Sequence, residues 1–467
     1  MKLRLILFLW VVAIADAGWF TRRNQPRHVV AQAQAGRVAC PNNIESLQAV
    51  VKYAHDNGKK IAVAGAQYSQ GGQTQFPGAI QIDMTCLNKI VNIDLVNKQI
   101  TVEAGITWAE ILRAIDPLGL SILAMQSYNA FSVGGSIGVN AHGQNIHDGQ
   151  VMNTIISLDV VKADGSLVQV GPARHTNLFS CVVGGYGLCG IIARATLQLT
   201  DNNMVEKKYK IMPTSAYPAY FKNKILLNKR VQLHSARLSV DPRALFNELI
   251  AITYYHVDGG RTIEALHHKK DSLKDLRDQW LFGLMRKYNW AKHYRFIAEK
   301  LIFEKPEIIS RNNAMNWTLS MLEYRSLMYK DILQEYFVPV DALPKFLVLA
   351  REIIRKNNVN ILNATIRYVP ADDITLMSYA PEPRFAIVLY INVGKRPADE
   401  RHTKNWTQKL IDAAFEVGGT FYLPYGLYAT REQVHEGYPG FQELIELKQR
   451  KFDPQETFVN QLYATYA

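Results

Sequence analysis

Cysteine is scarce in this chain of 467 residues, which contains only Cys40, Cys86, Cys181 and Cys189. None of the four stands in a CxxC pair or in a cluster with histidine, so no metal site is expected from their spacing. Four cysteines allow three complete disulfide pairings. The sequence does not choose among these pairings and free buried thiols.

Long apolar runs are also missing from the body of the chain, so no membrane-spanning helix is expected there. The N-terminus differs, because two basic residues precede an apolar run from Leu5 to Ala15, and Ala15-Asp16-Ala17 follows. This order predicts a signal peptide over residues 1–17, with an uncleaved anchor as the alternative. Either form predicts an exported protein, periplasmic or secreted and either free or membrane-associated.

Acidic residues are outnumbered, with 41 Asp and Glu against 53 Lys and Arg, a net charge of +12. The excess is spread along the chain, with one denser zone from Lys269 to Lys305. No nucleic-acid motif accompanies it, and export argues against a nucleic-acid partner. A solvated basic face is the first interpretation of this zone, and peripheral contact with an anionic membrane is the alternative.

Hydrophobic periodicity predicts alternating strands and helices up to about residue 200. Asn43 is expected to cap a helix over 44–57, and Thr107 a helix over 107–115. Strands are expected at 61–64, 79–83, 90–94, 99–103 and 191–199, and a hairpin at 155–162 and 166–170. Beyond residue 201 we expect helical stretches at 272–301 and 441–450 and strands at 335–339, 363–369 and 385–392.

Three glycine clusters stand out, at 65–73, 131–149 and 184–190. Glycine at this density indicates backbone that approaches another group closely or adopts positive φ. The first cluster follows a strand, and its backbone N–H groups could surround a phosphate. It is neither a Walker A loop nor a GxGxxG dinucleotide turn.

Taken together and in order, the motifs "VAGAQYSQGGQT", "EAGITWAEI", "FSVGGSIGVNAHGQN", "LDVVKADGS" and "VVGGYGLCGIIARATLQL" resemble the vanillyl-alcohol oxidase and p-cresol methylhydroxylase type of FAD enzymes. The resemblance covers roughly residues 35–201 and is nearest to the sugar-directed members, namely aldonolactone, alditol and decaprenylphosphoryl-ribose oxidases. It implies an α+β, two-domain FAD-binding fold of the PCMH type. The second, substrate (cap) domain would be built on an antiparallel sheet with flanking helices.

The implied domains are an FAD-binding domain at 30–201, a substrate domain at 202–430 and a C-terminal segment at 431–467 that returns to the FAD domain. The resemblance also implies FAD contacts along the three glycine clusters. These cofactor-binding candidates are Gly65, Ala66, Gln67, Tyr68, Ser69, Gly71, Gly72, Ser132, Gly134, Gly135, Gly138, Asn140, His142, Gly143, Gly187, Gly190 and Ile192.

Two positions depart from the family pattern. Many members attach FAD covalently through a histidine in the first loop, where this chain has Tyr68, so noncovalent FAD is expected. Sugar-directed relatives commonly carry a lysine near flavin N1 in the C-terminal region, where a cation stabilises reduced flavin. The segment from Phe421 to Tyr428 has no lysine, and Tyr425 or Tyr428 is the candidate to occupy that space.

His142 is the first catalytic candidate, because an imidazole can hold a substrate hydroxyl or accept its proton. The alternative is a histidine that only orders its loop through hydrogen bonds to the backbone. Tyr425, Gln334, Tyr336 and Asn392 are the further candidates. Strand alternation places Gln334 and Tyr336 on one face, and Glu335 and Phe337 on the other. Arg367 and Asn392 are polar residues in apolar strands, where either a ligand or a structural hydrogen bond would satisfy them.

The resulting hypothesis is oxidation of a hydroxyl carbon of a sugar, polyol, aldonolactone or lipid-linked sugar, with hydride transfer to flavin N5. The electrons would pass on to oxygen or another acceptor. The two departures from the family pattern keep open an alternative, a flavin-binding electron-transfer or sensory protein without alcohol turnover.

Overall fold

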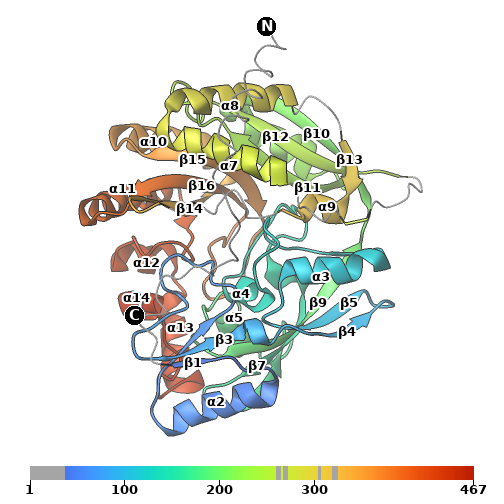
Figure 1. Cartoon of the computed structure of the whole chain (residues 1–467), viewed down its shortest axis with the longest axis vertical. Helices are drawn as coiled ribbons and strands as arrows, with labels where there is room; N and C mark the ends of the chain where they lie inside the picture. Colours follow the sequence, from blue (N-terminus) through green and yellow to red (C-terminus); the bar gives the residue numbers. More distant parts are fainter. Residues whose placement is uncertain (1–36, 259–264, 267–271, 303–306, 318–323, 325) are drawn as a thin grey trace.

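The structure is a computed structural model that describes residues 37–258, 265–266, 272–302, 307–317, 324 and 326–467 (Figure 1). The predicted signal peptide, residues 1–17, lies outside the described residues, as do both ends of the basic zone from Lys269 to Lys305. None of the described helices combines the length and the apolar character that crossing a membrane requires.

A small parallel sheet begins the FAD-binding half, with strands in the order β1-β3-β2. The strands are β1 (Arg37–Ala39), β2 (Ile61–Ala64) and β3 (Ile80–Asp83). Helix α2 (Ile44–Asp56) buries an apolar stripe that includes Leu47 and Val51. As predicted, Asn43 caps this helix, because its Oδ1 accepts a hydrogen bond from the Ser46 N–H at 2.7 Å.

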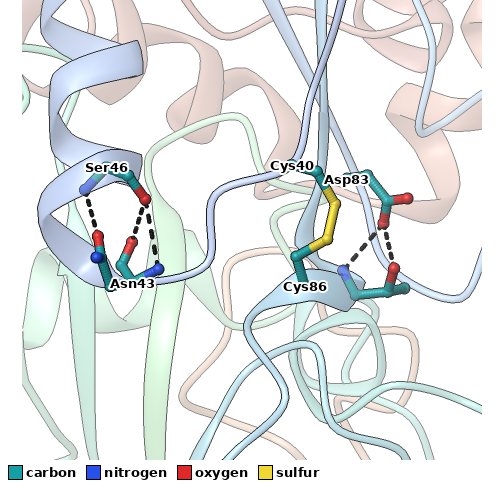
Figure 2. Close-up of a disulfide and its surroundings, with 6 residues drawn as sticks. Cys40, Asn43, Ser46, Asp83 and Cys86 are labelled. Atoms are coloured by element: carbon teal, nitrogen blue, oxygen red, sulfur yellow. Dashed lines mark hydrogen bonds between the residues drawn. A yellow bond between two sulfur atoms is a disulfide. The ribbon is translucent and has the colours of Figure 1, made fainter.

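One disulfide, Cys40–Cys86, ties the chain entering α2 to the turn after β3. Figure 2 shows it between the Asn43–Ser46 cap and the Asp83 side chain, whose Oδ1 accepts from the Thr85 N–H at 3.0 Å. Cys181 and Cys189 are free and buried. The structure therefore has one disulfide and two free thiols, a choice that the sequence had left open.

A second, antiparallel sheet has the order β4-β5-β9-β7-β8, and β6 also pairs with β9. Its strands are β4 (Ile90–Asp94), β5 (Gln99–Glu103), β6 (Leu120–Ile122), β7 (Ile155–Val161), β8 (Leu167–Val170) and β9 (Ile191–Asp201). The helices of this half are α3 (Trp108–Ile115), α4 (Val133–Gly138) and α5 (Thr176–Val182). Thr107 caps α3 through a capping box with Glu110, as predicted.

The substrate half is an eight-stranded antiparallel sheet with the order β13-β10-β12-β11-β15-β16-β14-β17. The strands are β10 (Met204–Pro213), β11 (Val231–Leu238), β12 (Glu248–His256), β13 (Glu307–Ser310), β14 (Tyr329–Pro339), β15 (Asn360–Val369), β16 (Arg384–Gly394) and β17 (Thr420–Phe421). Strand β14 begins six residues before its predicted start, because polar residues such as Asp331 interrupt the apolar pattern while the pairing with β16 continues.

Helices flank this sheet: α6 (Tyr217–Tyr220), α7 (Ser272–Lys287), α8 (Asn289–Ile302), α9 (Arg311–Met315), α10 (Leu343–Lys356) and α11 (Pro397–Phe415). The helical region predicted at 272–301 is thus two helices. The α+β class and the antiparallel sheet with flanking helices are as expected. The exact domain boundaries stay predictions.

The C-terminal segment contains α12 (Arg431–Gly437), α13 (Phe441–Leu447) and α14 (Gln461–Tyr466). Between the last two helices, Lys448 and Asp453 form an ion pair that is fully buried. Asp453 also accepts the N–H groups of Thr457 and Phe458, at 2.7 and 2.8 Å. Phe458 then pairs with Ile61 of β2, so the end of the chain extends the first sheet.

Candidate active site

Strand β14 presents different side chains to its two faces. On one face, Gln334 Nε2 donates to Thr407 Oγ1 of α11 at 2.7 Å, and the Tyr336 hydroxyl donates to Gln334 Oε1 at 2.6 Å. On the other face, Glu335 and Phe337 lie against His142. The alternation was predicted. The catalytic candidates Gln334 and Tyr336 contact α11 and each other, whereas Glu335 and Phe337 contact His142. Both faces of this strand are buried, so alternation alone does not identify the face that meets the site.

His142 lies at the junction of the two halves and is only 4% exposed. Its Nε2 lies 2.7 Å from Oε1 of Glu335, and the other carboxylate oxygen accepts a hydrogen bond from the Tyr425 hydroxyl at 3.1 Å. Among the described residues, Nδ1 of His142 has no hydrogen-bond partner. His142, Glu335 and Tyr425 therefore form a connected chain that ends in an available imidazole nitrogen.

Burial raises the pKa of Tyr425 well above its ordinary value, and the negative charge of Glu335 raises it further. The phenol therefore stays protonated and can donate to the carboxylate. Of the two tyrosines proposed from the sequence, Tyr425 lies at the site. Tyr428 instead lies near Glu400, whose charge helps to raise its pKa.

The loop that carries His142 is held by Tyr379, which is buried, and Tyr422, which is half-buried. Asn140 has a positive φ of 44°, a conformation that asparagine adopts more readily than most other non-glycine residues. The hydroxyl of Tyr379 donates to the Asn140 carbonyl at 2.6 Å, and that of Tyr422 donates to the Val139 carbonyl at 2.8 Å. The same two rings pack against His142, with centroids 5.9 and 6.1 Å from the imidazole. Tyrosines of the substrate half thus hold the histidine loop in place through these hydrogen bonds.

The first glycine cluster is anchored to the segment that contains Tyr425. Gln70 N–H donates to the Pro424 carbonyl at 2.9 Å, and Gln73 Nε2 donates to the carbonyls of Leu423 and Tyr425 at 2.5 and 2.8 Å. Ser132, in the second cluster, accepts the N–H of Ala66 at 3.2 Å. The loop is therefore fixed between the second cluster and the Tyr425 segment.

This loop fits a pyrophosphate. Gln67 and Gly72 have positive φ, at 59° and 77°. Among the described residues, no protein group accepts the N–H groups of Gln67, Ser69 and Gly72. Amides turned out of the regular hydrogen-bond pattern in this way are suited to phosphate oxygens. Gly65 faces Ser132 Oγ so closely that a Cβ would overlap it. Tyr68 packs its ring edge-on against Phe131, with centroids 4.6 Å apart.

The second and third clusters pack on each other. The N–H groups of Gly184 and Tyr186 donate to the carbonyls of Ile137 and Gly138, at 3.0 and 2.9 Å. Gly187, with φ of 74°, lies beside Val63 of β2.

Several glycines in these clusters allow close packing. A Cβ on Gly134, Gly143 or Gly190 would collide with Ala104, Met125 or Val160 respectively. Gly135 lies close to Ser132, Gly138 faces open space, and Gly71 packs against Tyr425. Ile192 lies in β9 and pairs with Val160.

Asn392 is not brought to this site. It pairs with Asp331 across β14 and β16, and its amide donates to that carboxylate at 2.7 Å. Arg286 and Tyr390 complete the same buried cluster. Asp331 lies four residues from Glu335 along β14, or roughly 13 Å at the rise of a strand. Asn392 therefore makes a structural hydrogen bond, one of the two alternatives that the sequence left open for it.

Arg367 shares the face of Glu335. In the register of the sheet, Arg367 pairs with Ala386, which pairs with Phe337 of β14. Among the described residues its guanidinium has no hydrogen-bond or ion-pair partner. Its positive charge opposes the rise in pKa that burial produces at both Tyr425 and Tyr128. Arg367 therefore faces the neighbourhood of the His142–Glu335–Tyr425 chain.

Comparisons with known proteins identify an FAD-binding family and several similar oxidoreductases. An FAD binding domain family matches residues 35–171. The chain is 25% identical to decaprenylphosphoryl-β-D-ribose oxidase of Mycolicibacterium smegmatis over 89% of its own length and 91% of that protein. It is 22% identical to L-gulonolactone oxidase of Mus musculus over 90% and 92% of the two chains. D-arabinono-1,4-lactone oxidase of Yarrowia lipolytica is 31% identical over 34% of this chain and 31% of its own.

Glu335 was missed as a functional candidate in the sequence. A carboxylate in an apolar strand is rarely buried without a purpose, and it could have indicated this residue. The site brings together the expected cofactor loop, the histidine loop and Tyr425, with Glu335 in place of Gln334 and Tyr336. The chain is an FAD-binding oxidoreductase, similar along most of its length to decaprenylphosphoryl-β-D-ribose oxidase and L-gulonolactone oxidase.

Proposed function

We propose that this oxidoreductase oxidises a hydroxyl-bearing carbon of a sugar, polyol, aldonolactone or lipid-linked sugar. The observation that carries the proposal is the His142–Glu335–Tyr425 chain beside the loop suited to the FAD pyrophosphate. The names of the relatives support the substrate range, since they include a lipid-linked ribose oxidase and two aldonolactone oxidases.

Bound FAD would supply the hydride acceptor, flavin N5. Side chains of the protein would accept the hydroxyl proton. Glu335, by accepting the Nε2 hydrogen of His142, fixes the tautomer that leaves Nδ1 as an acceptor. His142 then takes the hydroxyl proton at Nδ1 while the carbinol hydrogen leaves with its electron pair, and the carbon becomes a carbonyl. Tyr425 holds Glu335 in place from its other oxygen.

Arg367 is proposed to contact the polar groups of the substrate, because it faces the site without a protein partner among the described residues. Gly65, Ala66, Gln67, Ser69, Gly71 and Gly72 would hold the pyrophosphate, and the segments around Ser132–Asn140 and Gly187–Ile192 the rest of FAD. The cofactor is proposed to be noncovalent, since Tyr68 has no imidazole to form the usual link. Oxygen or another acceptor would reoxidise the flavin.

We also propose that the protein acts after export, in the periplasm or as a secreted protein. The N-terminal pattern supports this location. The zone from Lys269 to Lys305 is the proposed place of peripheral membrane contact, which would suit a lipid-linked substrate.

The first test is the visible spectrum of the purified mature protein, repeated on the supernatant after acid precipitation. We expect a flavin spectrum and FAD in the supernatant. Anaerobic addition of aldonolactones, alditols and lipid-linked sugars should then bleach the flavin with at least one of them. Bound FAD that no alcohol reduces would instead support the electron-transfer or sensory alternative. Flavin retained in the pellet would contradict the noncovalent attachment.

A further inference from the structure

Helix α8 exposes an apolar stripe, although it also buries Ala291 and Phe296 in the core. Its large exposed side chains are Trp290, Tyr294 and Leu301, which are 52%, 47% and 39% exposed. They stand at positions i, i+4 and i+11, so they share one stripe, with half-buried Ile297 between them. Figure 1 shows α8 at the outer edge of the molecule, on the side farthest from α2. A helix on the surface of a soluble protein ordinarily turns this stripe inward.

Two charged residues of α8, Lys292 and Arg295, are buried as well. Lys292 is 4% exposed and donates to Asn360 Oδ1 at 2.6 Å. Arg295 donates to the Leu362 carbonyl at 3.0 Å and pairs with Glu299 at 2.9 Å. Glu299 also pairs with Arg237 of β11. These charges are used within the protein, so they cannot be the groups that meet an anionic partner.

The exposed rings form a continuous array. Tyr288, 47% exposed, stacks on Trp290 with ring centroids 5.8 Å apart and planes 20° apart. Trp290 in turn meets Tyr294 edge-on, with centroids 6.2 Å apart. Single exposed apolar residues need no explanation, but a contiguous array of this kind marks a contact surface.

The composition of the array and the charge of the chain favour an anionic lipid surface over a second copy of the chain. Tryptophan and tyrosine have apolar rings with one polar edge, and they favour the boundary between lipid and water. A second copy of the chain would bring a further net charge of +12 and repel the first, whereas an anionic bilayer would attract it. Lys287, exposed beside the array, adds to this attraction.

We propose that α8 lies flat on an anionic membrane surface, with Tyr288, Trp290, Tyr294 and Leu301 inserted at the level of the headgroups. The proposal rests on the peripheral membrane contact proposed above, but not on alcohol oxidation. It replaces a contact through basic side chains of α8 by one through its aromatic stripe. The substrate half would thereby face the membrane.

The test is co-sedimentation of the mature, flavin-loaded protein with vesicles of phosphatidylcholine alone or mixed with phosphatidylglycerol. We expect binding to the anionic vesicles and weaker binding to the neutral ones. The double variant Trp290→Ser with Tyr294→Ser should bind at least about tenfold more weakly, from the burial of apolar area that each ring loses. Tyr53→Ser is the matched control, because Tyr53 is 53% exposed on α2 at the other end of the molecule (Figure 1).

Unchanged vesicle binding by the double variant would overturn the proposal, as would failure of the unaltered protein to bind either vesicle. Concentration-dependent self-association lost in the double variant, without vesicle binding, would assign the stripe to a second copy and also overturn it. Flavin reduction by a water-soluble substrate should be equal in the double variant and in Tyr53→Ser. A defect in oxidation is therefore distinguishable from a defect in membrane contact.

Discussion

Glu335 offers both of its oxygens within the site, one to His142 and one to Tyr425, and it is only 3% exposed. A buried carboxylate with two such partners is weak evidence for added stability, so orientation of its partners is the role we propose for it. In the proposed mechanism it is a positioning residue, because it would act on the substrate only through the imidazole. The available Nδ1 of His142 depends on it.

Replacing Glu335 by Gln should leave the fold intact and slow flavin reduction by about 10²–10³-fold, because the amide no longer enforces the tautomer with a free Nδ1. Stopped-flow reduction of the flavin at saturating substrate measures this rate. The pH profile of the rate should change shape as well, which a loss of packing alone would not cause. FAD content should stay equal to that of the unaltered protein.

Gln334→Met is the matched control, one residue away but on the opposite face of β14. Its side chain bonds Thr407 and Tyr336 rather than His142. The substitution should lower the unfolding temperature and leave flavin reduction within about threefold. Equal slowing by both variants would show that the assignment of the faces is wrong.

At the scale of elements, local signals were predictable and long-range ones were not. The caps at Asn43 and Thr107 depend on residues three positions away, so the sequence contains the whole interaction. The face of β14 that meets His142 depends on which half of the molecule covers it. The contacts of α8 include the ion pair of Glu299 with Arg237, which is distant in the sequence.

The cofactor loop gives a prediction at the same scale. Gly65→Ala places a Cβ against Ser132 Oγ, the atom that accepts the Ala66 N–H. Overpacking of this kind costs about 1–3 kcal/mol. The loop would move to relieve it, so FAD should bind about tenfold to a hundredfold more weakly. Titration of the apoprotein with FAD, followed by flavin fluorescence, measures the affinity.

Gly283→Ala is the control for that titration, because a Cβ on Gly283 meets nothing within 4 Å. It should bind FAD with unchanged affinity. Normal FAD binding by Gly65→Ala would mean that the loop does not hold the pyrophosphate.

At the scale of the whole molecule, the site exists only where the halves meet. The FAD half supplies His142 and the cofactor loop, and the substrate half supplies Glu335 and Tyr379. His234 of β11 adds a backbone link, because its N–H donates to the carbonyl of Gln144, two residues after His142. Unfolding of the substrate sheet should therefore release the histidine loop and the cofactor with it.

His234 makes this unfolding sensitive to acid. It is fully buried between Tyr217 and Thr253, with hydrogen bonds of 2.9 Å to each. Burial lowers its pKa to about 3, against an ordinary value near 6.5. Because the folded pKa is depressed, the unfolded chain binds the proton first. The stability from neutral His234 is complete above pH 6.5 and is lost progressively as the pH falls towards 3.

At pH 5 this single group should remove about 2 kcal/mol of stability relative to neutral pH, since pH 5 lies well above the folded pKa. His234→Gln can keep both hydrogen bonds and cannot titrate. The variant should be less stable at pH 7, because its amide packs poorly against the ring of Phe221. Its unfolding temperature should nevertheless fall less between pH 7 and pH 5. Circular dichroism and flavin fluorescence should give the same midpoint if the site and the sheet unfold together. An equal acid-induced drop in both proteins would show that His234 is not the group responsible.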